Sequence, residues 1–338
     1  MPRTVSIIIC TRNKAESLRE TLRAISAVEV PADLSAEVIV ADNGSTDQTP
    51  AVVSEFAASQ QKFSVRYVSV PTPGQSRARN AGISAASGEI ILFTDDDVRP
   101  PSNWIEGMCR PILRGEADAT TGTTRIAAHL ERQWMGPLHR GYLACAPTPP
   151  QTAPLPRGAP LLGANMAFAR HVLSRVPAFD ERLGPGALGF ADDDLFGMQL
   201  GEAGFRKLHV VGCEPEHHFD PSRLPRAAFA ERAWKQGLCE GYIRYHWLHE
   251  DIKAPRLRML RRWVRLQSVR WKNRGRWKHE EGLPEWELPL IAEVSRFTQY
   301  LAERGTPRRY ATRRGWAVSA LAENRSGCSM ISTGQVVT

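Results

Sequence analysis

The sequence lacks the long apolar runs and paired cysteines that mark several protein classes. No stretch approaches the roughly 18 to 20 uncharged apolar residues of a membrane span, and the apolar run before Arg12 is too short for a secretory signal. The six cysteines are scattered and form no C-x-x-C pair, which argues against zinc ribbons and redox motifs. These absences predict a cytoplasmic protein with reduced thiols.

The composition is that of an ordinary globular protein, except in the distribution of charge. Of the 338 residues, 42% are apolar and 24% are charged, which excludes wholesale disorder and collagen-like repeats. The length predicts about two domains. The formal net charge is +8, but residues 256–278 carry ten Lys or Arg and no acid, so the rest of the chain has a net charge of −2. The basic character therefore belongs to one late segment.

The first hundred residues alternate between short apolar runs and helical segments. The apolar runs predict buried strands at residues 5–10, 37–41, 65–70 and 89–94. The segments between and after them predict helices at residues 15–27, 49–59 and 76–86. This order predicts an α/β fold with a mostly parallel sheet flanked by helices. Ligands bind beyond the carboxyl ends of the strands in such sheets, so we expect the site there.

The rest of the chain is less regular. Residues 145–160 are rich in proline and predict an extended loop without strand or helix, because proline lacks an N–H and fixes its own backbone angle. A helix is predicted from residue 191 to residue 204. Residues 226–338 predict a mainly helical, basic extension.

Three adjacent carboxylates, Asp95, Asp96 and Asp97, follow the fourth predicted strand. Like charges at this spacing repel one another unless a counter-charge is present. A hard divalent cation is the natural counter-charge, because Mg²⁺ takes one or two carboxylates and completes its shell with phosphate oxygens and water. The run predicts a metal site, with a solvated acidic turn as the alternative.

Two more polar clusters follow strand ends. Asp42 can accept a hydrogen bond from a base or a ribose hydroxyl, and Gly44 permits a tight turn; an Asx turn is the alternative. Arg77 and Arg79 lie at the start of a predicted helix, where guanidinium groups and the helix N-terminus favour phosphate. The alternative is a solvated face on which Arg77 pairs with a nearby acid.

A second acidic run, Asp192 to Asp194, stands at the start of a predicted helix. One carboxylate there is explained by capping and by the helix dipole. Three carboxylates are more than capping and the dipole explain. A carboxylate placed over a bound donor could serve as a general base. His217 and His218 follow, as metal ligands or as ordinary surface residues.

These clusters together carry a family resemblance. The resemblance is to the family 2 inverting glycosyltransferases of GT-A fold over roughly residues 4–225, through the segments SIIICTRN, VIVADNGSTDQT, PGQSRARNAGI, EIILFTDDDV, GANMAFAR and FADDDLFGMQLGEAGFRKLHV. It implies transfer of a sugar, typically a hexose, from a nucleotide-diphosphate sugar to a hydroxyl with inversion, aided by Mg²⁺ or Mn²⁺. Residues 1–125 would then bind the donor, residues 126–225 would bind the acceptor and hold the base, and residues 226–338 would form the extension.

The resemblance and the strand-end clusters also imply roles for individual residues. The metal ligands would be Asp95, Asp97 and His217, with His218 as the alternative to His217. The acceptor would contact Gly163, Ala164 and Asn165. The nucleotide sugar would contact Thr11, Arg12, Asn13, Asp42, Gly44, Arg77, Arg79, Asn80, Asp95 and Asp96.

The catalytic base is implied less uniquely. Asp192 falls on the family's base position, and Asp193 is the alternative because the acidic run is degenerate. The family commonly has Glu before that Asp, where this chain has Ala191, and Gln199 replaces the family's helix arginine. These departures leave a catalytically inactive relative as an alternative.

Two other function classes stay open. A sugar-nucleotide nucleotidyltransferase would favour a glycine-rich, lysine-bearing loop after the first strand, and CTRNKAES has none. A nucleic-acid-binding protein is suggested by the pI of 9.4 and the Arg/Trp-rich segment. That function would leave the strand-end clusters unexplained, so we expect no nucleic-acid partner.

The basic segment predicts an amphipathic helix. Its apolar positions near one face are Leu257, Leu260, Trp263, Val264 and Trp271, together with Gln267. Such a stripe predicts packing on the catalytic domain, an oligomer contact, or docking on an anionic membrane surface. The last fits a peripheral enzyme on the inner face of the plasma membrane that acts on a glycan or lipid-linked acceptor in polysaccharide or cell-envelope biosynthesis.

Overall fold

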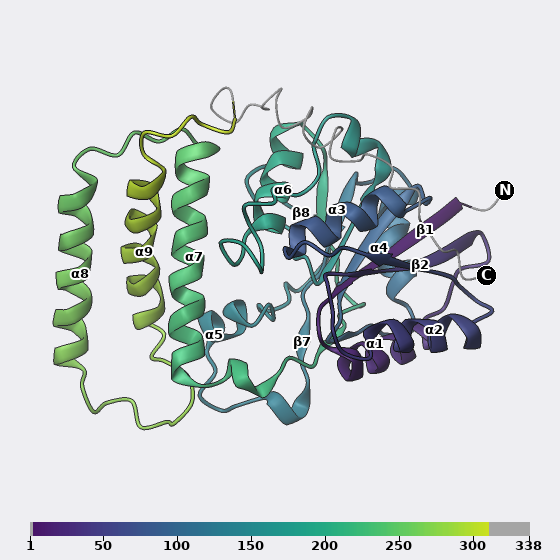
Figure 1. Ribbon diagram of the computed structural model, residues 1–338, viewed down its shortest axis with the longest axis horizontal. Coiled ribbons are helices and arrows are strands. Elements are labelled where there is room, and N and C mark those ends of the chain that lie inside the picture. Colours follow the sequence, from purple (N-terminus) through teal and green to yellow (C-terminus); the bar gives the residue numbers. More distant parts are fainter. Residues whose placement is uncertain (1–2, 311–338) are drawn as a thin grey trace.

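The computed structural model describes residues 3–310, which form two sheets and a set of flanking helices (Figure 1). The strands are β1 (Arg3–Thr11), β2 (Leu34–Asp42), β3 (Ser64–Ser69), β4 (Ile90–Asp95), β5 (Val98–Arg99), β6 (Ala119–Thr121), β7 (Arg125–Ile126), β8 (Ala153–Pro154), β9 (Asn165–Ala169), β10 (Lys207–His209) and β11 (Glu216–His217). The α-helices are α1 (Ala15–Ala27), α2 (Thr49–Ser59), α3 (Gln75–Ala85), α4 (Trp104–Leu113), α5 (Pro137–Tyr142), α6 (Asp192–Glu202), α7 (Arg226–His246), α8 (Pro255–Lys272) and α9 (Glu287–Glu303). Short 3₁₀ turns cover Ala128–Leu130, Arg170–Ser174 and Pro221–Arg223.

The predicted sheet is confirmed. The large sheet has the strand order β3-β2-β1-β4-β9-β6-β10-β8, and β1 pairs in parallel with both β2 and β4. The four strands and three helices predicted in the first hundred residues lie within three residues of the observed bounds. β9 is antiparallel to its neighbours β4 and β6. Residues on both sides of position 125 therefore share one continuous sheet.

Side-chain alternation along the strands explains why both faces of this sheet are covered. Val5, Ile7 and Ile9 point to a core shared with α1, α2 and α4, whereas Ile8 and Cys10 point to a core shared with α3 and α6. A strand buried on both faces needs a continuous apolar run, which is the pattern of β1. The polar residue Thr11, at the carboxyl end of β1, therefore lies at the edge of the sheet where the parallel strands end.

The prediction that residues 145–160 contain no strand is wrong at one point. Ala153 and Pro154 form β8, which pairs with His209 and Leu208 of β10. β8 is the outermost strand of the sheet. Proline is tolerated there because an edge strand has one side without ladder hydrogen bonds.

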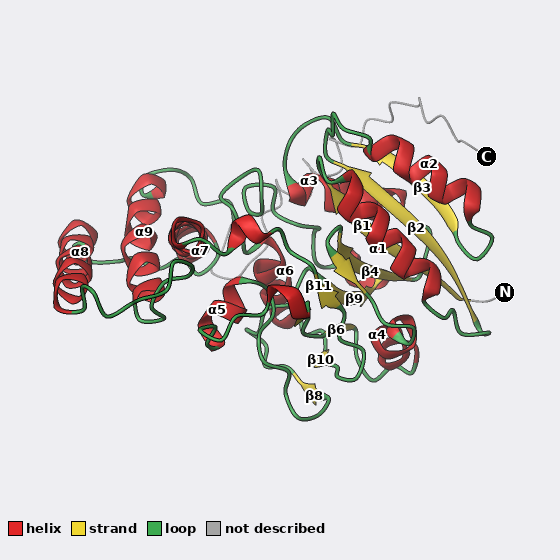
Figure 2. Ribbon diagram, turned by 90° about the horizontal axis from the view of Figure 1, so that it is seen from below, coloured by secondary structure: helices red, strands yellow, loops and turns green. Residues whose placement is uncertain are grey.

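Between residues 226 and 303 the C-terminal extension is mainly helical, as predicted, and consists of α7, α8 and α9 with loops between them, while residues 311–338 lie outside the described part. α7 lies nearest the sheet, α9 packs beside it and α8 is outermost (Figures 1 and 2). The predicted basic helix is shorter than residues 256–278, because α8 ends at Lys272. Within residues 3–310, no helix is both long and apolar enough to cross a bilayer.

Candidate active site

The register of the parallel strands gathers the predicted clusters at one sheet edge. Thr11 of β1 stands opposite Asp42 of β2, and Cys10 stands opposite Asp95 of β4. A cavity of about 940 Å³ opens at this edge. The predicted site residues that line it are Thr11, Arg12, Arg79, Asp95, Asp96, Asp97, Ala164, Asp192, Asp193 and His217.

Three residues predicted to contact the nucleotide shape the loop after β2. The Asp42 carboxylate accepts hydrogen bonds from the Ser45 backbone N–H (2.9 Å) and the Tyr67 hydroxyl (2.6 Å). The Asn13 side-chain oxygen accepts from the Thr46 N–H at 2.7 Å. Gly44 has φ of 75°, which a tight turn requires and an L side chain resists. They lie outside the cavity lining, and their contact with a nucleotide stays a prediction.

Other predicted residues hold the walls of the cavity rather than line them. Arg77 pairs with Glu181 at 2.7 Å, which is the alternative predicted for it. The Asn80 side chain exchanges hydrogen bonds with the backbone of Phe179. Asn165 is fully buried, accepting from the Trp104 indole and donating to the Thr123 carbonyl.

The three carboxylates after β4 are compensated by protein cations. Lys14 Nζ lies 3.1 Å from Asp96 Oδ1 and 3.0 Å from Asp97 Oδ2. Arg223 also contacts Asp97 Oδ2, at 3.3 Å, and His217 Nε2 lies 3.2 Å from Asp97 Oδ1. Although burial opposes ionisation, His217, Arg223 and Lys14 hold the pKa of Asp97 well below its usual range. Asp97 is therefore an anion at neutral pH.

His217 is engaged at both ring nitrogens. Nε2 contacts Asp97, and Nδ1 lies 2.9 Å from the Leu143 carbonyl oxygen. Burial favours the neutral ring, but Asp97 outweighs it and raises the pKa of His217 to about 9. In this arrangement His217 is an imidazolium partner of Asp97. His218 lies outside the cavity lining and contacts Glu216 at 3.3 Å.

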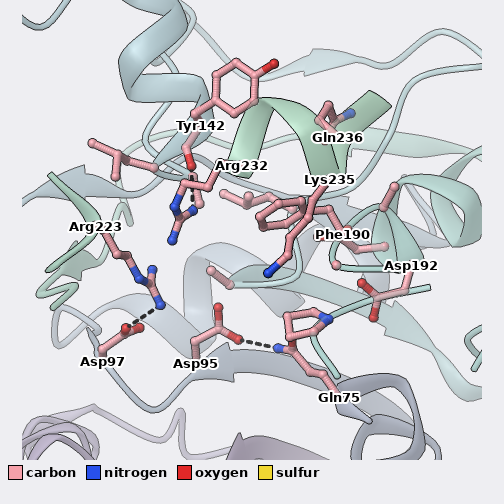
Figure 3. Close-up of a pocket in the computed structure, with 18 of the residues that line it drawn as sticks. Gln75, Asp95, Asp97, Tyr142, Phe190, Asp192, Arg223, Arg232, Lys235 and Gln236 are labelled. Atoms are coloured by element: carbon pink, nitrogen blue, oxygen red, sulfur yellow. Dashed lines mark hydrogen bonds and ion pairs between the residues drawn. The ribbon is translucent and has the colours of Figure 1, made fainter. Parts of the chain in front are cut away.

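Asp95 differs from its two neighbours. Its side chain is 27% exposed, and its carboxylate lies 3.9 Å from Arg79 Nη2 and 3.5 Å from Gln75 Nε2. Figure 3 shows Asp95 and Asp97 on the same side of the cavity. Within residues 3–310, no group of three or more His, Cys, Asp or Glu side chains is arranged to hold a metal ion. The protein thus offers two hard oxygen donors here, and a bound ion would need oxygen ligands from a substrate or water.

Arg79 connects the two acidic runs. Its Nη1 lies 2.6 Å from Asp192 Oδ2, and its Nη2 faces Asp95. The Arg79 and Asp192 side chains are only 4% and 3% exposed, and Ser76 donates a further hydrogen bond to Asp192. Such a pair is costly to break because removal of either partner leaves a buried charge. Asp192 is thus held in place as the counter-ion of Arg79.

Asp193 forms no ion pair with a cation among residues 3–310. Its Oδ2 accepts the Gly163 N–H at 2.6 Å, and its Oδ1 accepts the Asp194 N–H at 3.0 Å. Burial and the neighbouring Asp192 charge raise the pKa of Asp193 to about 6. A Cβ at Gly163 would overlap the Arg79 guanidinium and lie 2.8 Å from Asp193 Oδ2, so glycine permits this close approach.

The wall opposite the first acidic run comes from α7. Figure 3 shows Arg232 and Lys235 reaching into the cavity from the side opposite Asp95 and Asp97. Lys235 pairs with Glu231 at 2.6 Å. Arg232 donates to the Tyr142 carbonyl at 2.9 Å and lies over the Phe190 ring, 5.7 Å from its centroid. Burial and nearby Arg223 lower the pKa of Arg232 to about 10, which marks a charge with too little compensation.

Lys14, Arg223 and Arg232 were missed at the sequence level. Lys14 directly follows the Thr-Arg-Asn segment at the end of β1, so the strand-end rule that selected its neighbours could have included it. Arg223 lies in the 3₁₀ turn Pro221–Arg223 and Arg232 lies inside α7. Neither has a local signal, because only tertiary packing brings them to the cavity.

Comparison with known proteins agrees with the predicted resemblance. Residues 6–173 match the family model described as glycosyl transferase family 2. The glycosyltransferase AglE of Haloferax volcanii is 34% identical over 102 residues, which are 30% of this chain and 33% of the relative. The succinoglycan biosynthesis protein ExoM of Rhizobium meliloti is 31% identical over 143 residues, covering 42% of this chain and 41% of the relative. The chain therefore matches less than half the length of these relatives.

Solved structures identify the fold. A mannosyltransferase from Pyrobaculum calidifontis in complex with GDP-Man and Mn²⁺ superposes with a TM-score of 0.62, over 90% of this chain and 88% of that one, at 17% identity. Residues 1–349 of TarS from S. aureus superpose with a TM-score of 0.50, over 91% and 93% of the two chains, also at 17% identity. The predicted GT-A fold is confirmed.

Proposed function

We propose that this chain is a family 2 glycosyltransferase that moves a sugar, typically a hexose, from a nucleotide-diphosphate sugar to an acceptor hydroxyl with inversion. One observation carries the proposal: Arg79 joins the acidic run after β4 to the acidic run that begins α6, inside a single cavity. The first run suits a diphosphate with its cation, and the second supplies a base one side chain away. A transferase needs both within one substrate's length.

The donor would lie over the ends of β1 and β4. Thr11 and Arg12 line the cavity there, beside Asp95 and Asp96. Asp95 and Asp97 would hold Mg²⁺ or Mn²⁺, since two carboxylates with phosphate oxygens are a donor set that a hard cation accepts. When bound, the ion neutralises negative charge on the departing diphosphate. The Mn²⁺ complex of the similar mannosyltransferase supports this assignment.

Asp193 is the better candidate for the base. Its pKa of about 6 leaves it ionised at neutral pH, yet more basic than an ordinary Asp. Asp192 is held by Arg79 and Ser76, and acts as a positioning residue. The acceptor oxygen attacks the anomeric carbon as its proton passes to Asp193, and the bond from that carbon to the diphosphate oxygen breaks. A single displacement of this kind inverts the configuration.

The cationic wall supports an anion in the cavity. Arg223 and Arg232 lie opposite or beside the first acidic run, where they would stabilise the diphosphate as it gains charge. Because Arg232 contacts no carboxylate among residues 3–310, an incoming anion would supply the compensation that it lacks. Gly163 donates its N–H to Asp193 and the next residue, Ala164, lines the cavity, so both would lie beside the acceptor.

The acceptor is proposed to be a glycan or a lipid-linked sugar, used in polysaccharide or cell-envelope biosynthesis on the cytoplasmic side of the membrane. Support comes from relatives named for succinoglycan biosynthesis and for undecaprenyl-phosphate 4-deoxy-4-formamido-L-arabinose transfer. The described cavity is large and open enough to admit a second sugar beside the donor, at about 940 Å³.

The test is a panel of nucleotide sugars incubated with Mg²⁺ or Mn²⁺ and scored for release of nucleoside diphosphate. Turnover with one or a few donors is expected, and an acceptor found this way allows the anomeric configuration of the product to be determined by NMR. The Asp193→Asn variant serves as the control for contaminating hydrolases. Release at the same rate by wild type and variant would contradict the assignment of Asp193 as the base, and release with none of the donors would contradict the proposed transfer.

A further inference from the structure

Part of the face of α8 that points away from the protein is apolar. Of eight large hydrophobic side chains that residues 3–310 leave exposed, five belong to α8, and they are between 47% and 66% exposed: Leu257, Leu260, Trp263, Val264 and Trp271. We call these five residues the α8 stripe. Solvent-exposed apolar side chains gathered on one helix usually mark an interaction surface.

The α8 stripe is not the side that packs on the protein. α8 contacts the helical layer through Leu266, which is buried, and through the partly buried Met259 and Val269. At 100° per residue these three positions lie on the opposite side of the helix from Leu257 and Val264. Packing on the catalytic domain, one of the predicted explanations of the stripe, is therefore wrong.

Arginines flank the stripe, and several have no acidic partner among residues 3–310. α8 carries seven Lys or Arg and no acid. Arg262 pairs with Glu293 at 3.4 Å and Arg270 with Glu287 at 2.7 Å. For Arg258, Arg261 and Arg265 the described part of the chain provides no ion pair. With Arg262 and Phe297, these three line a surface hollow of about 460 Å³.

Charge and hydrophobicity together select the occupant of this face. A second copy of the chain would bring one set of unpaired arginines against another, which is unfavourable. A nucleic acid would satisfy the arginines but would leave Leu257, Leu260 and Val264 in water. An anionic bilayer satisfies both, since phosphate headgroups meet the guanidinium groups while the stripe enters the boundary of the acyl chains.

We propose that α8 docks this protein on an anionic lipid bilayer, lying in the plane of the surface with the α8 stripe inserted. Trp263 stands at the flank of the stripe and lies at headgroup depth, where indole rings are favoured, whereas Trp271 lies between Leu260 and Val264 and inserts with them. Arg261 contacts lipid phosphates from the edge of the stripe beside Leu257, and Arg265 and Arg258, about 80° and 100° round the helix from Leu257, reach the headgroups with extended side chains. α8 is the helix farthest from the large sheet, so docking leaves the cavity at the sheet edge uncovered by α8 (Figures 1 and 2). The inference does not depend on the proposed transfer reaction.

The test is co-sedimentation of the full chain with vesicles of phosphatidylglycerol and phosphatidylcholine, and of phosphatidylcholine alone. We expect binding only to the anionic vesicles. This binding should weaken as the salt concentration is raised from about 50 to about 500 mM. Changing Arg258, Arg261 and Arg265 to Gln should lower the partition coefficient about 100-fold, because each basic residue near the headgroups adds roughly fivefold. The matched control changes three exposed arginines of the sheet-containing part of the chain to Gln and should leave vesicle binding unchanged. These are Arg114, Arg175 and Arg206.

A second pair of variants tests the apolar half of the proposal. Trp263→Ser with Trp271→Ser should reduce vesicle binding at least tenfold and leave retention on heparin, a soluble polyanion, unchanged; the exposed Trp234→Ser is the matched control. Circular dichroism confirms that each variant is folded. Equal binding to neutral and anionic vesicles, no binding to either, or wild-type vesicle binding by the double tryptophan variant would overturn the proposal.

Discussion

Replacing Asp193 by Asn separates the two carboxylates that compete for the role of base. The amide keeps the size of the side chain and can still accept the Gly163 N–H through its oxygen. It cannot take a proton from an acceptor hydroxyl. We expect kcat to fall by about 10² to 10⁴, the usual contribution of a general base. Affinity for nucleoside diphosphate should stay within about twofold, since the diphosphate is assigned to the other acidic run.

The pH profile of the wild type gives the same residue a second signature. With a pKa of about 6, Asp193 is mostly protonated at pH 5 and mostly ionised at pH 7. The value of kcat/KM should therefore rise roughly tenfold between these pH values and then level off. The Asn variant should lose this limb of the profile while retaining its low rate.

Stability distinguishes Asp193 from Asp192. Burial raises the folded-state pKa of Asp193 above its unfolded value, so this group makes the folded state less stable as pH rises from about 4 to 6. The Asp193→Asn variant should be at least as stable as wild type at pH 7. Asp192→Asn instead leaves buried Arg79 without its counter-ion, at a cost of about 3–5 kcal/mol, and should lower the midpoint of urea unfolding.

The assays are steady-state kinetics at pH 5 to 8, titration calorimetry with nucleoside diphosphate, and urea unfolding of both variants. One combination would refute the assignment: near-normal kcat for Asp193→Asn together with a severe kcat loss for a stably folded Asp192→Asn. Asp192 would then be the base, as the family resemblance implies.

Three further predictions concern the same cavity. Excess EDTA should abolish turnover, and full activity in EDTA would contradict the metal assignment. Asp95→Asn should also abolish turnover, without loss of stability. Asp97→Asn should abolish turnover and destabilise the fold, because it removes the carboxylate that pairs with several cations. Arg232→Gln should weaken calorimetric binding of nucleoside diphosphate about 10- to 100-fold and leave monophosphate binding unchanged, and an equal loss for both would exclude the proposed diphosphate contact. Gly163→Ala should lower kcat while the protein stays folded, because the added methyl group displaces Arg79 or Asp193, and unchanged kinetics would show that this close approach is not needed.

The strand-end residues could be predicted because the rule behind them is topological. Thr11 and Asp95 follow apolar strands, and parallel pairing through β1 brings those strand ends to one edge whatever the loops do. The same rule does not say which side chains face the cavity. Asp42 follows a strand in the same way, yet its carboxylate turns to Ser45 and Tyr67.

Residues that only tertiary packing brings to the cavity have no recognisable signal in the local sequence. Arg232 sits inside a long helix, where an arginine normally indicates a solvated face. It reaches the cavity because α7 packs beside the sheet domain, a contact that no periodicity records. The α8 stripe illustrates the reverse problem, since apolar spacing indicates an amphipathic helix but not which of its sides is covered.

The division of the cavity has a consequence for substrate choice. The family match ends at residue 173 and so includes Arg79 and the first acidic run, which are assigned to the donor diphosphate. Asp193, His217 and the α7 wall lie beyond it. Relatives that share the matched part can therefore share donor chemistry and still differ in acceptor. Exchanging α7 side chains such as Lys235 and Gln236, which face the cavity, should alter acceptor KM before it alters donor KM. The opposite order would place Lys235 and Gln236 on the donor side of the reaction, together with Arg232.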